Sequence, residues 1–260
     1  MPLQTAHKPK QSLGQNFLVD PNVANNIVGA FDLDVADTVL EIGPGPGALT
    51  ERLLPRVNRL IAVEIDRNLA AALQDRFGQE PNFELHNMDF LKFDPEGFDY
   101  PALRIVGNIP YNITSPILFK VLDIRRRVKD LTMLIQKEVA LRAVAAPNTK
   151  DYGILAIMSQ AFSEVELLLN VPRTVFRPRP KIDSALVRWT FTDKISRNLH
   201  DPDLFKTIVK QAFGQRRKML RNTLKSYYMT NPDLWDFTLR PEQIPVTDWI
   251  ELANRLHALK

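Results

Sequence analysis

The stretch that decides the fold is VLEIGPGPGALTERLL, residues 39–54. It starts as a short apolar run, passes through a turn containing Gly43, Gly45 and Gly47, and continues with helix-forming residues. Glycines between a strand and a helix let the backbone approach a ligand closely. The spacing is GxGxG, which differs from the GxGxxG of dinucleotide-binding enzymes. We therefore predict a nucleotide-type ligand site at these three glycines.

Comparable apolar runs recur along the chain and are separated by segments with helical patterning. They are TVLEIG (38–43), RLIAVEID (59–66), FELHNMD (83–89), LRIVGN (103–108) and LTMLIQ (131–136). Strands that alternate with helices predict a parallel α/β sheet with right-handed crossovers, and continuous apolar runs are typical of strands buried on both faces. Two later runs, EVELLLNV (164–171) and SALVRWTF (184–191), are expected to pair antiparallel beside this sheet. Asp20 and Pro21 predict the start of an amphipathic helix.

The pattern changes near residues 192–200. From about Ile195 onward only helical periodicity is present, with apolar residues at Leu204, Phe205, Ile208, Val209, Ala212 and Phe213. We therefore predict two domains. Residues 1–194 form an α/β domain with a basic N-terminal arm, and residues 195–260 form a small all-α domain.

Composition excludes several classes of protein. The 260 residues are 45% hydrophobic and 25% charged, as in globular proteins, and no apolar run approaches the length of a membrane span. The first 15 residues have no apolar core, so we expect no secretory signal. The absence of cysteine excludes disulfides, thiolate metal sites and RNA cytosine-C5 methylation through a cysteine adduct. We expect a cytoplasmic protein with no metal and no membrane association.

The net charge of +4 points weakly to nucleic acid. Basic residues cluster in HKPK (7–10), RRR (125–127) and QRRKMLRNTLK (215–225). Taken singly, each such run is more often a solvated face than a binding site. In the last run, Arg217, Arg221 and Lys225 are spaced four apart, which predicts one shared helix face.

Two acidic residues follow strands downstream of the glycine turn. Glu64 ends the next strand, 21 positions after Gly43, where an acid accepts hydrogen bonds from both ribose hydroxyls. Asp89 follows the third strand and is placed to receive the amino group of an adenine, although capping the next turn is an equal alternative. These features predict a ligand with a ribose and an adenine, which describes both NAD and S-adenosylmethionine.

The tetrapeptide Asn108-Ile109-Pro110-Tyr111 favours S-adenosylmethionine. The exocyclic amine of adenine is a poor nucleophile, so an enzyme that alkylates it must orient its lone pair. The Asn108 side-chain oxygen and the Ile109 carbonyl are candidates to accept its two N–H groups, and Pro110 restricts where that carbonyl points. Tyr111 is placed to stack on an extruded base. The alternative is a strand end followed by a proline turn and a packed tyrosine.

Six motifs together resemble the bacterial KsgA/Dim1 family of ribosomal RNA adenine dimethyltransferases over nearly the whole chain. They are GQNFL (14–18), EIGPGPGALT (41–50), VEID (63–66), GNIPYNI (107–113), FRPRPKIDSALV (176–187) and FGQRRKMLRNTL (213–224). The resemblance implies a Rossmann-like class I S-adenosylmethionine-dependent methyltransferase domain with a small all-α C-terminal domain. It also implies N6-dimethylation of two adjacent adenosines in a hairpin loop near the 3′ end of 16S rRNA, with a role in small-subunit biogenesis.

The resemblance also assigns residues. Cofactor contacts would fall on Asn16, Leu18, Gly43, Glu64, Asp89 and Asn108, together with the remaining turn glycines. Asn108 and Tyr111 would serve the target base, with Phe176 as a second stacking aromatic; Asn16, Leu18 and Phe176 rest on the resemblance alone. A ribosomal substrate favours phosphate contacts for the basic residues Arg217, Lys218, Arg221 and Lys225. We expect the protein to act as a monomer.

Three alternatives compete with this reading. A large-subunit (23S) rRNA dimethyltransferase of the macrolide-resistance type shares the catalytic domain, but the long basic helical C-terminus argues against it. A noncatalytic ribosome assembly factor would not need Glu64, Asp89, Asn108 and Tyr111, and all four are present. An NAD-dependent oxidoreductase would need a paired Tyr/Lys or a His set for hydride transfer, which the motifs do not offer.

Overall fold

The computed structural model describes residues 9–10, 13–95 and 102–259. His7 and Lys8 of the predicted basic arm lie outside them. The chain divides into two compact units, Met1–Ala140 with Glu166–Phe191 and Leu141–Val165 with Thr192–Lys260. The expected division at residue 195 placed 141–165 in the first domain. In the structure this segment groups with the C-terminal helices.

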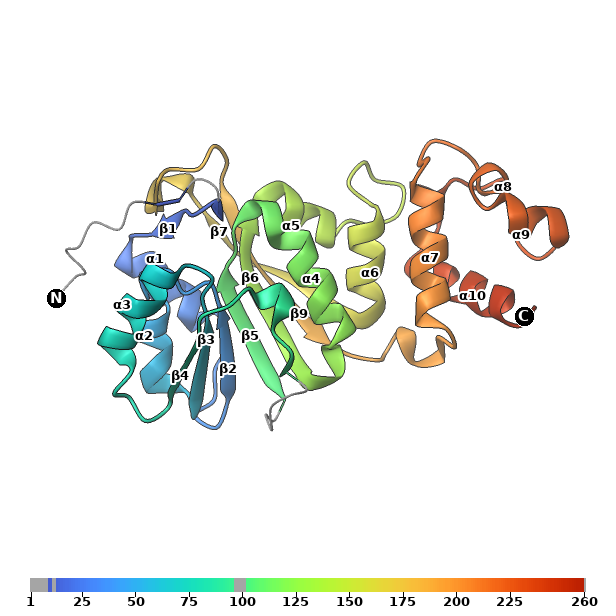
Figure 1. The fold of residues 1–260 in the computed structure, drawn as a ribbon. Coiled ribbons are helices and arrows are strands. Elements are labelled where there is room, and N and C mark those ends of the chain that lie inside the picture. The colour runs from blue at the N-terminus through green and yellow to red at the C-terminus, as the bar shows by residue number, and fades with distance from the viewer. Residues whose placement is uncertain (1–8, 11–12, 96–101, 260) are drawn as a thin grey trace. The chain divides into compact units, whose positions relative to one another are not determined.

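The first unit is built on a seven-stranded sheet with the order β4-β3-β2-β5-β6-β9-β7, counted over the described residues (Figure 1). The strands are β2 (Thr38–Ile42), β3 (Arg59–Val63), β4 (Phe83–His86), β5 (Leu103–Asn108), β6 (Val128–Gln136), β7 (Ser163–Val171) and β9 (Ser184–Phe191). Strands β2 to β6 pair in parallel, and β9 pairs antiparallel to β6. The predicted parallel sheet with an antiparallel addition is therefore confirmed.

The helices of this unit lie before, between and after the parallel strands in the chain. They are α1 (Pro21–Gly29), α2 (Thr50–Leu53), α3 (Arg67–Phe77), α4 (Thr114–Asp123) and α5 (Lys137–Ala143), with 3₁₀ turns at Leu54–Arg56, Phe90–Lys92, Tyr111–Ile113, Arg125–Arg127 and Arg173–Val175. The predicted cap of α1 is confirmed, because Asp20 accepts the N–H groups of Asn22 at 2.9 Å and Val23 at 3.0 Å. Every residue of β2 is buried, as expected for a strand covered on both faces.

A second, two-stranded sheet was not predicted. β1 (Phe17–Leu18) pairs antiparallel with β8 (Phe176–Arg177), so that Leu18 lies opposite Phe176. The Val19 N–H extends the pairing by donating to the Val175 carbonyl at 2.9 Å. This pairing fixes the N-terminal segment to the proline-rich segment between β7 and β9.

A buried ion network joins segments of the first unit near the starts of β2, β5 and β6. Arg104 is buried, with 4% of its surface exposed. Its guanidinium donates to Asp130 at 2.9 Å, to Asp37 at 2.8 Å and to the Asp32 carbonyl at 2.6 Å. Burial alone raises the pKa of Asp37, but hydrogen bonds from Arg104 and the Asp34 N–H, together with the positive charge of Arg104, lower that pKa below its usual value. The network therefore holds Asp37 ionised.

The second unit is predominantly helical, with α6 (Ile154–Phe162), α7 (Pro202–Phe213), α8 (Leu220–Thr223), α9 (Lys225–Thr230) and α10 (Val246–His257), and 3₁₀ turns at Ser196–Asn198 and Pro241–Gln243. α6, α7 and α10 pack against one another. The rings of Phe162 and Phe205 meet edge to face with centroids 6.0 Å apart, and those of Phe213 and Trp249 lie 6.1 Å apart. These contacts explain why 141–165 belongs with the C-terminal helices.

The predicted helix face through Arg217, Arg221 and Lys225 is wrong. α7 ends at Phe213, Arg217 lies in a turn, and the other two residues belong to separate short helices. The backbone at Met219 is extended, and the N–H groups of Leu220 and Arg221 donate to the carbonyls of Leu239 and Phe237. Hydrogen bonds to another segment thus replace the bonds that a continuous helix needs.

Candidate active site

The carboxyl ends of three neighbouring strands meet at one edge of the sheet. In the register of the sheet, Ile42 at the end of β2 lies opposite Val63 of β3 and Gly107 of β5. The residues that follow are the glycine turn, Glu64 and Asn108. The predicted cofactor and target-base motifs are therefore adjacent in space, at the edge where open α/β sheets bind ligands.

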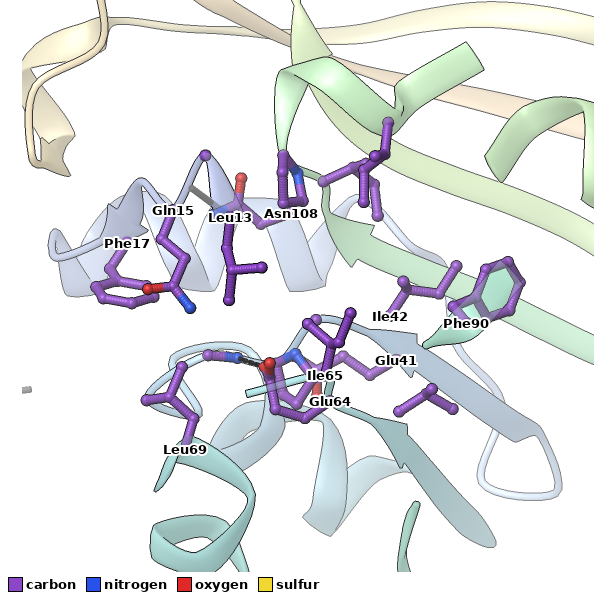
Figure 2. A pocket seen from close by; sticks show the side chains of 18 of the residues that line it. Leu13, Gln15, Phe17, Glu41, Ile42, Glu64, Ile65, Leu69, Phe90 and Asn108 are labelled. Carbon is purple, nitrogen blue, oxygen red and sulfur yellow. Dashed lines mark hydrogen bonds between the residues drawn. The ribbon is translucent and has the colours of Figure 1, made fainter. Parts of the chain in front are cut away.

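A cavity of about 200 Å³ lies at this edge. Of the predicted site residues, Asn16, Leu18, Gly43, Gly45, Glu64, Asp89, Asn108, Ile109, Pro110 and Tyr111 line it. Figure 2 shows Leu13 and Asn108 on one side of the cavity and Glu64 and Ile65 on the other. Gly47 and Phe176 are not among the described lining residues.

The three glycines of the turn have different tasks. All three have positive φ, +62° at Gly43, +58° at Gly45 and +90° at Gly47. A Cβ at Gly43 would meet nothing within 4 Å, so this glycine borders open space. A Cβ at Gly47 would lie 2.9 Å from Cε2 of Phe77, which is closer than van der Waals contact allows. Gly47 thus permits packing against α3, and its predicted contact with a cofactor stays a prediction.

Glu64 is held rigidly at the end of β3. Its residue is 3% exposed, and its carboxylate accepts the Gly45 N–H at 3.0 Å through Oε2 and the Asp66 N–H at 2.8 Å through Oε1. Burial raises the pKa of Glu64, an effect that these backbone hydrogen bonds oppose. A carboxylate offers about four lone-pair sites, so the two oxygens retain capacity for further donors. This arrangement fits the two hydroxyls of a ribose.

Asp89 fills one of the two roles that the sequence left open, and its contact with an adenine amine stays a prediction. Its Oδ1 accepts the Leu91 N–H at 2.9 Å and so caps the turn Phe90–Lys92, while the residue also lines the cavity. A carboxylate has a second oxygen available for an amino group. Ile65 and Met88 add apolar lining beside it, which suits a flat heterocyclic ring.

The Asn108 amide is oriented by the N-terminal segment. Its Nδ2 donates to the Asn16 carbonyl at 3.0 Å, and the Asn16 side chain in turn donates to the Gly14 carbonyl at 3.1 Å. With the nitrogen engaged in this way, Oδ1 of Asn108 is the end that remains to accept a hydrogen bond. Ile109 is 1% exposed, and its N–H donates to the Leu134 carbonyl at 3.3 Å.

Tyr111 and Phe176 are the two aromatic residues predicted to stack on the target base. The described residues that line the cavity include Tyr111 but not Phe176. The Tyr111 hydroxyl lies 2.8 Å from Oγ of Ser184. Burial and the charge of Asp183 raise the pKa of Tyr111, although the bond to Ser184 lowers it. Phe176 is 1% exposed and packs in the hydrophobic core with Leu18 and Val175. Its predicted contact with a base stays a prediction.

Glu41 is a cavity residue that the sequence analysis did not identify. It is 1% exposed and accepts a hydrogen bond from Oγ1 of Thr50 at 2.7 Å. Burial raises the pKa of Glu41, the Thr50 bond lowers it and the charge of Glu64 raises it, and together they bring this pKa to about 8. The carboxyl is therefore largely protonated at neutral pH. A carboxylic acid inside the apolar run TVLEI was the available signal.

The Asp66 carboxylate binds two side chains of the N-terminal segment. Oδ2 of Asp66 receives the Lys10 ammonium at 2.9 Å and the Gln15 amide at 3.3 Å. Burial alone raises the pKa of Asp66, but these contacts and the Asn68 N–H lower it below its usual value. The charged carboxylate thus helps to keep residues 13–18 over the site.

Within the described ranges, no cluster of three or more His, Cys, Asp or Glu side chains is arranged to hold a metal ion. Over the same part of the chain, none of the helices combines the length and apolar character needed to cross a bilayer.

The family model for ribosomal RNA adenine dimethylases matches residues 6–244. The chain belongs to this family. A "Ribosomal RNA small subunit methyltransferase A" of Aromatoleum aromaticum is 42% identical over 259 residues, covering 97% of this chain and 96% of the relative. A protein of the same name from Chlorobium phaeobacteroides is 46% identical over 252 residues, covering 96% and 94%.

Solved structures agree with the assignment to the adenine dimethylase family. A dimethyladenosine transferase from Plasmodium falciparum superposes with a TM-score of 0.79 at 26% identity, covering 93% of this chain and 98% of that one. The 23S rRNA methyltransferase ErmE gives 0.69 at 28% identity, covering 93% and 99%. The predicted Rossmann-like methyltransferase fold and the prediction of an rRNA adenine dimethyltransferase are therefore confirmed.

Proposed function

We propose that this protein dimethylates N6 of two adjacent adenosines in a hairpin loop near the 3′ end of 16S rRNA, within the small ribosomal subunit. The observation that carries the proposal is the Asn108 amide, which Asn16 orients beside the glycine turn and Glu64. The names of the relatives at 42% and 46% identity support the small subunit as substrate. The enzyme works in the cytoplasm as a monomer and takes part in small-subunit biogenesis.

S-adenosylmethionine is the methyl donor, and its sulfonium supplies an activated methyl group. The chain's part is to hold it. The backbone at Gly43 and Gly45 approaches it closely, Glu64 accepts its ribose hydroxyls, and Asp89 accepts its adenine amine. Asn16 and Leu18 border the same cavity from the N-terminal side.

Asn108 and its neighbours position the target adenine. In the first transfer, Oδ1 of Asn108 and the carbonyl of Ile109 accept the two N6 hydrogens, which directs the nitrogen lone pair toward the methyl group. In the second transfer, one of these acceptors holds the single remaining N6 hydrogen. Each transfer releases one N6 proton and one S-adenosylhomocysteine. Tyr111 stacks on the extruded base, with Phe176 as the proposed second aromatic. Positioning supplies most of the rate enhancement, because the donor is already activated.

The basic segment of the helical unit binds rRNA phosphates in this proposal. Arg217, Lys218, Arg221 and Lys225 are exposed. Their placement on a turn and two short helices allows contacts with several phosphates along a curved backbone. Such contacts fix orientation and carry no sequence information.

The test is to incubate unmethylated small subunits with the protein and labelled S-adenosylmethionine, then to digest the rRNA to nucleosides. We expect N6,N6-dimethyladenosine from subunits and none with Asn108→Ala over the same interval. Absence of the product with the wild-type protein would refute the proposal. Methylation of naked 23S rRNA in place of subunits would instead favour an activity like that named for ErmE.

A further inference from the structure

Ser184 occupies a position that the sheet defines closely. It is the first residue of β9, lies opposite Gln136 of β6, and is 0% exposed. The residue before it is also fixed, because the Asp183 carbonyl accepts the Lys137 N–H at 3.0 Å and its Oδ1 accepts the Arg173 N–H at 3.0 Å. The Ser184 hydroxyl is therefore a fixed point in the first unit.

Tyr111 has a less constrained backbone. It begins the three-residue 3₁₀ turn Tyr111–Ile113, which is held by the bond from the Ile113 N–H to the Pro110 carbonyl at 3.1 Å. A short turn fixes the Cα position but leaves the ring free to rotate about its side-chain bonds. The contact of 2.8 Å between the phenol oxygen and Oγ of Ser184 holds the far end of the ring.

We infer that Ser184 is a positioning residue for methyl transfer, which acts by holding the Tyr111 ring where the target base stacks. The inference rests on the proposed function, since it requires an adenine on that ring. A site of this kind needs its contact side chains locked by a further layer of hydrogen bonds before the substrate arrives. Ser184 is not among the described residues lining the cavity, so its effect on the reaction passes through Tyr111.

The first test compares Ser184→Ala with wild type on unmethylated small subunits. We expect kcat to fall about 3- to 10-fold, the range for losing one neutral hydrogen bond, with KM for the subunit and the Kd for S-adenosylmethionine unchanged. Ser163→Ala is the matched control, because this serine is 4% exposed and donates to the Ser159 carbonyl at 2.6 Å. Although Ser163 begins β7, it groups with Ser159 in the second unit. The kcat of Ser163→Ala stays at the wild-type value.

A double-mutant cycle separates positioning from a general loss of structure. Tyr111→Phe removes the same hydrogen bond without altering the strand, so it lowers kcat by a similar factor, and adding Ser184→Ala then lowers it no further. Independent, multiplying losses would overturn the inference, as would a wild-type kcat in either single variant. If Ser184→Ala does not fold, Tyr111→Phe alone decides.

The inference and the proposed function fail in different ways. Wild-type protein that forms no dimethyladenosine refutes the proposed function, and the inference with it. Active wild-type protein with unaffected Tyr111→Phe and Ser184→Ala variants refutes the inference alone.

Discussion

Replacing Glu41 by glutamine is expected to remove a pH dependence from the stability of the sheet-containing unit. Burial raises the pKa of Glu41 to about 8 in the folded protein, against 4.5 for an unperturbed glutamate. Between these values the unfolded chain releases this proton and the folded chain keeps it. The folded state then binds more protons, so the free energy of unfolding falls as pH rises.

The slope of the free energy of unfolding against pH follows from the number of protons that the folded state holds and the unfolded state releases. One proton bound in the folded state and absent from the unfolded state changes the free energy of unfolding by about 1.4 kcal/mol per pH unit. Glutamine cannot ionise and still accepts the Thr50 hydroxyl. Burial also raises the pKa of Glu64, but that residue is present in both proteins and largely cancels in their difference.

The assay is urea unfolding at several pH values between 5 and 8, with the fluorescence of Trp189 as the signal. This is the only tryptophan of the first unit, so Trp235→Phe and Trp249→Phe in both proteins isolate its signal. The stability of wild type relative to Glu41→Gln should fall by about 1.4 kcal/mol per pH unit. A difference that does not change with pH would refute the reasoning. Glu80→Gln, at an exposed carboxylate, serves as the control for replacing a glutamate by glutamine.

Four further outcomes are expected. Asn108→Ala slows methyl transfer by about 2–4 kcal/mol in single-turnover assays, because a preorganised polar contact to the reacting amine is lost; an unchanged rate contradicts its role. Asp130→Asn destabilises the first unit by about 3–5 kcal/mol in urea unfolding, because it leaves Arg104 underpaired. Gly47→Ala costs about 1–3 kcal/mol of stability from strain at positive φ, read as a lower Tm. Arg221→Ala weakens subunit binding and reduces the slope of log binding constant against log salt concentration by about one unit. An unaltered slope would show that Arg221 does not contact an rRNA phosphate.

The stability that the Asp37–Arg104 ion pair contributes is expected to be lost in acid. Because the pKa of Asp37 is lowered in the folded state, its contribution to stability is present above about pH 4 and is lost as pH falls through the folded value. Acid unfolding curves of wild type and Asp37→Asn should therefore converge at low pH. Curves that stay parallel down to the acid limit contradict this account.

The sheet and most of the cavity were predictable because their signals are local. Apolar runs marked the parallel strands, and the glycine turn, Glu64 and Asn108 each follow such a run, so sheet register alone brings them together. The pairing of Phe17–Leu18 with Phe176–Arg177 was not predictable, because two residues carry no periodicity.

Other features depended on contacts that spacing does not encode. Arg217, Arg221 and Lys225 have helical spacing, but Leu220 and Arg221 bond to residues 237–239 and the helix is interrupted. Gly43, which borders open space, and Gly47, which is tightly packed, look alike in the sequence and differ only in their neighbours. Glu41 required knowledge of its burial.

The β1–β8 pairing has a consequence for synthesis of the protein. Residues 13–18 wall one side of the cofactor cavity, yet β1 pairs with Phe176–Arg177, roughly 160 positions later in the chain. During translation, the strands that carry the glycine turn, Glu64 and Asn108 emerge well before this partner does. The pairing that holds residues 17–18 in place can therefore form only after β8 has been synthesised.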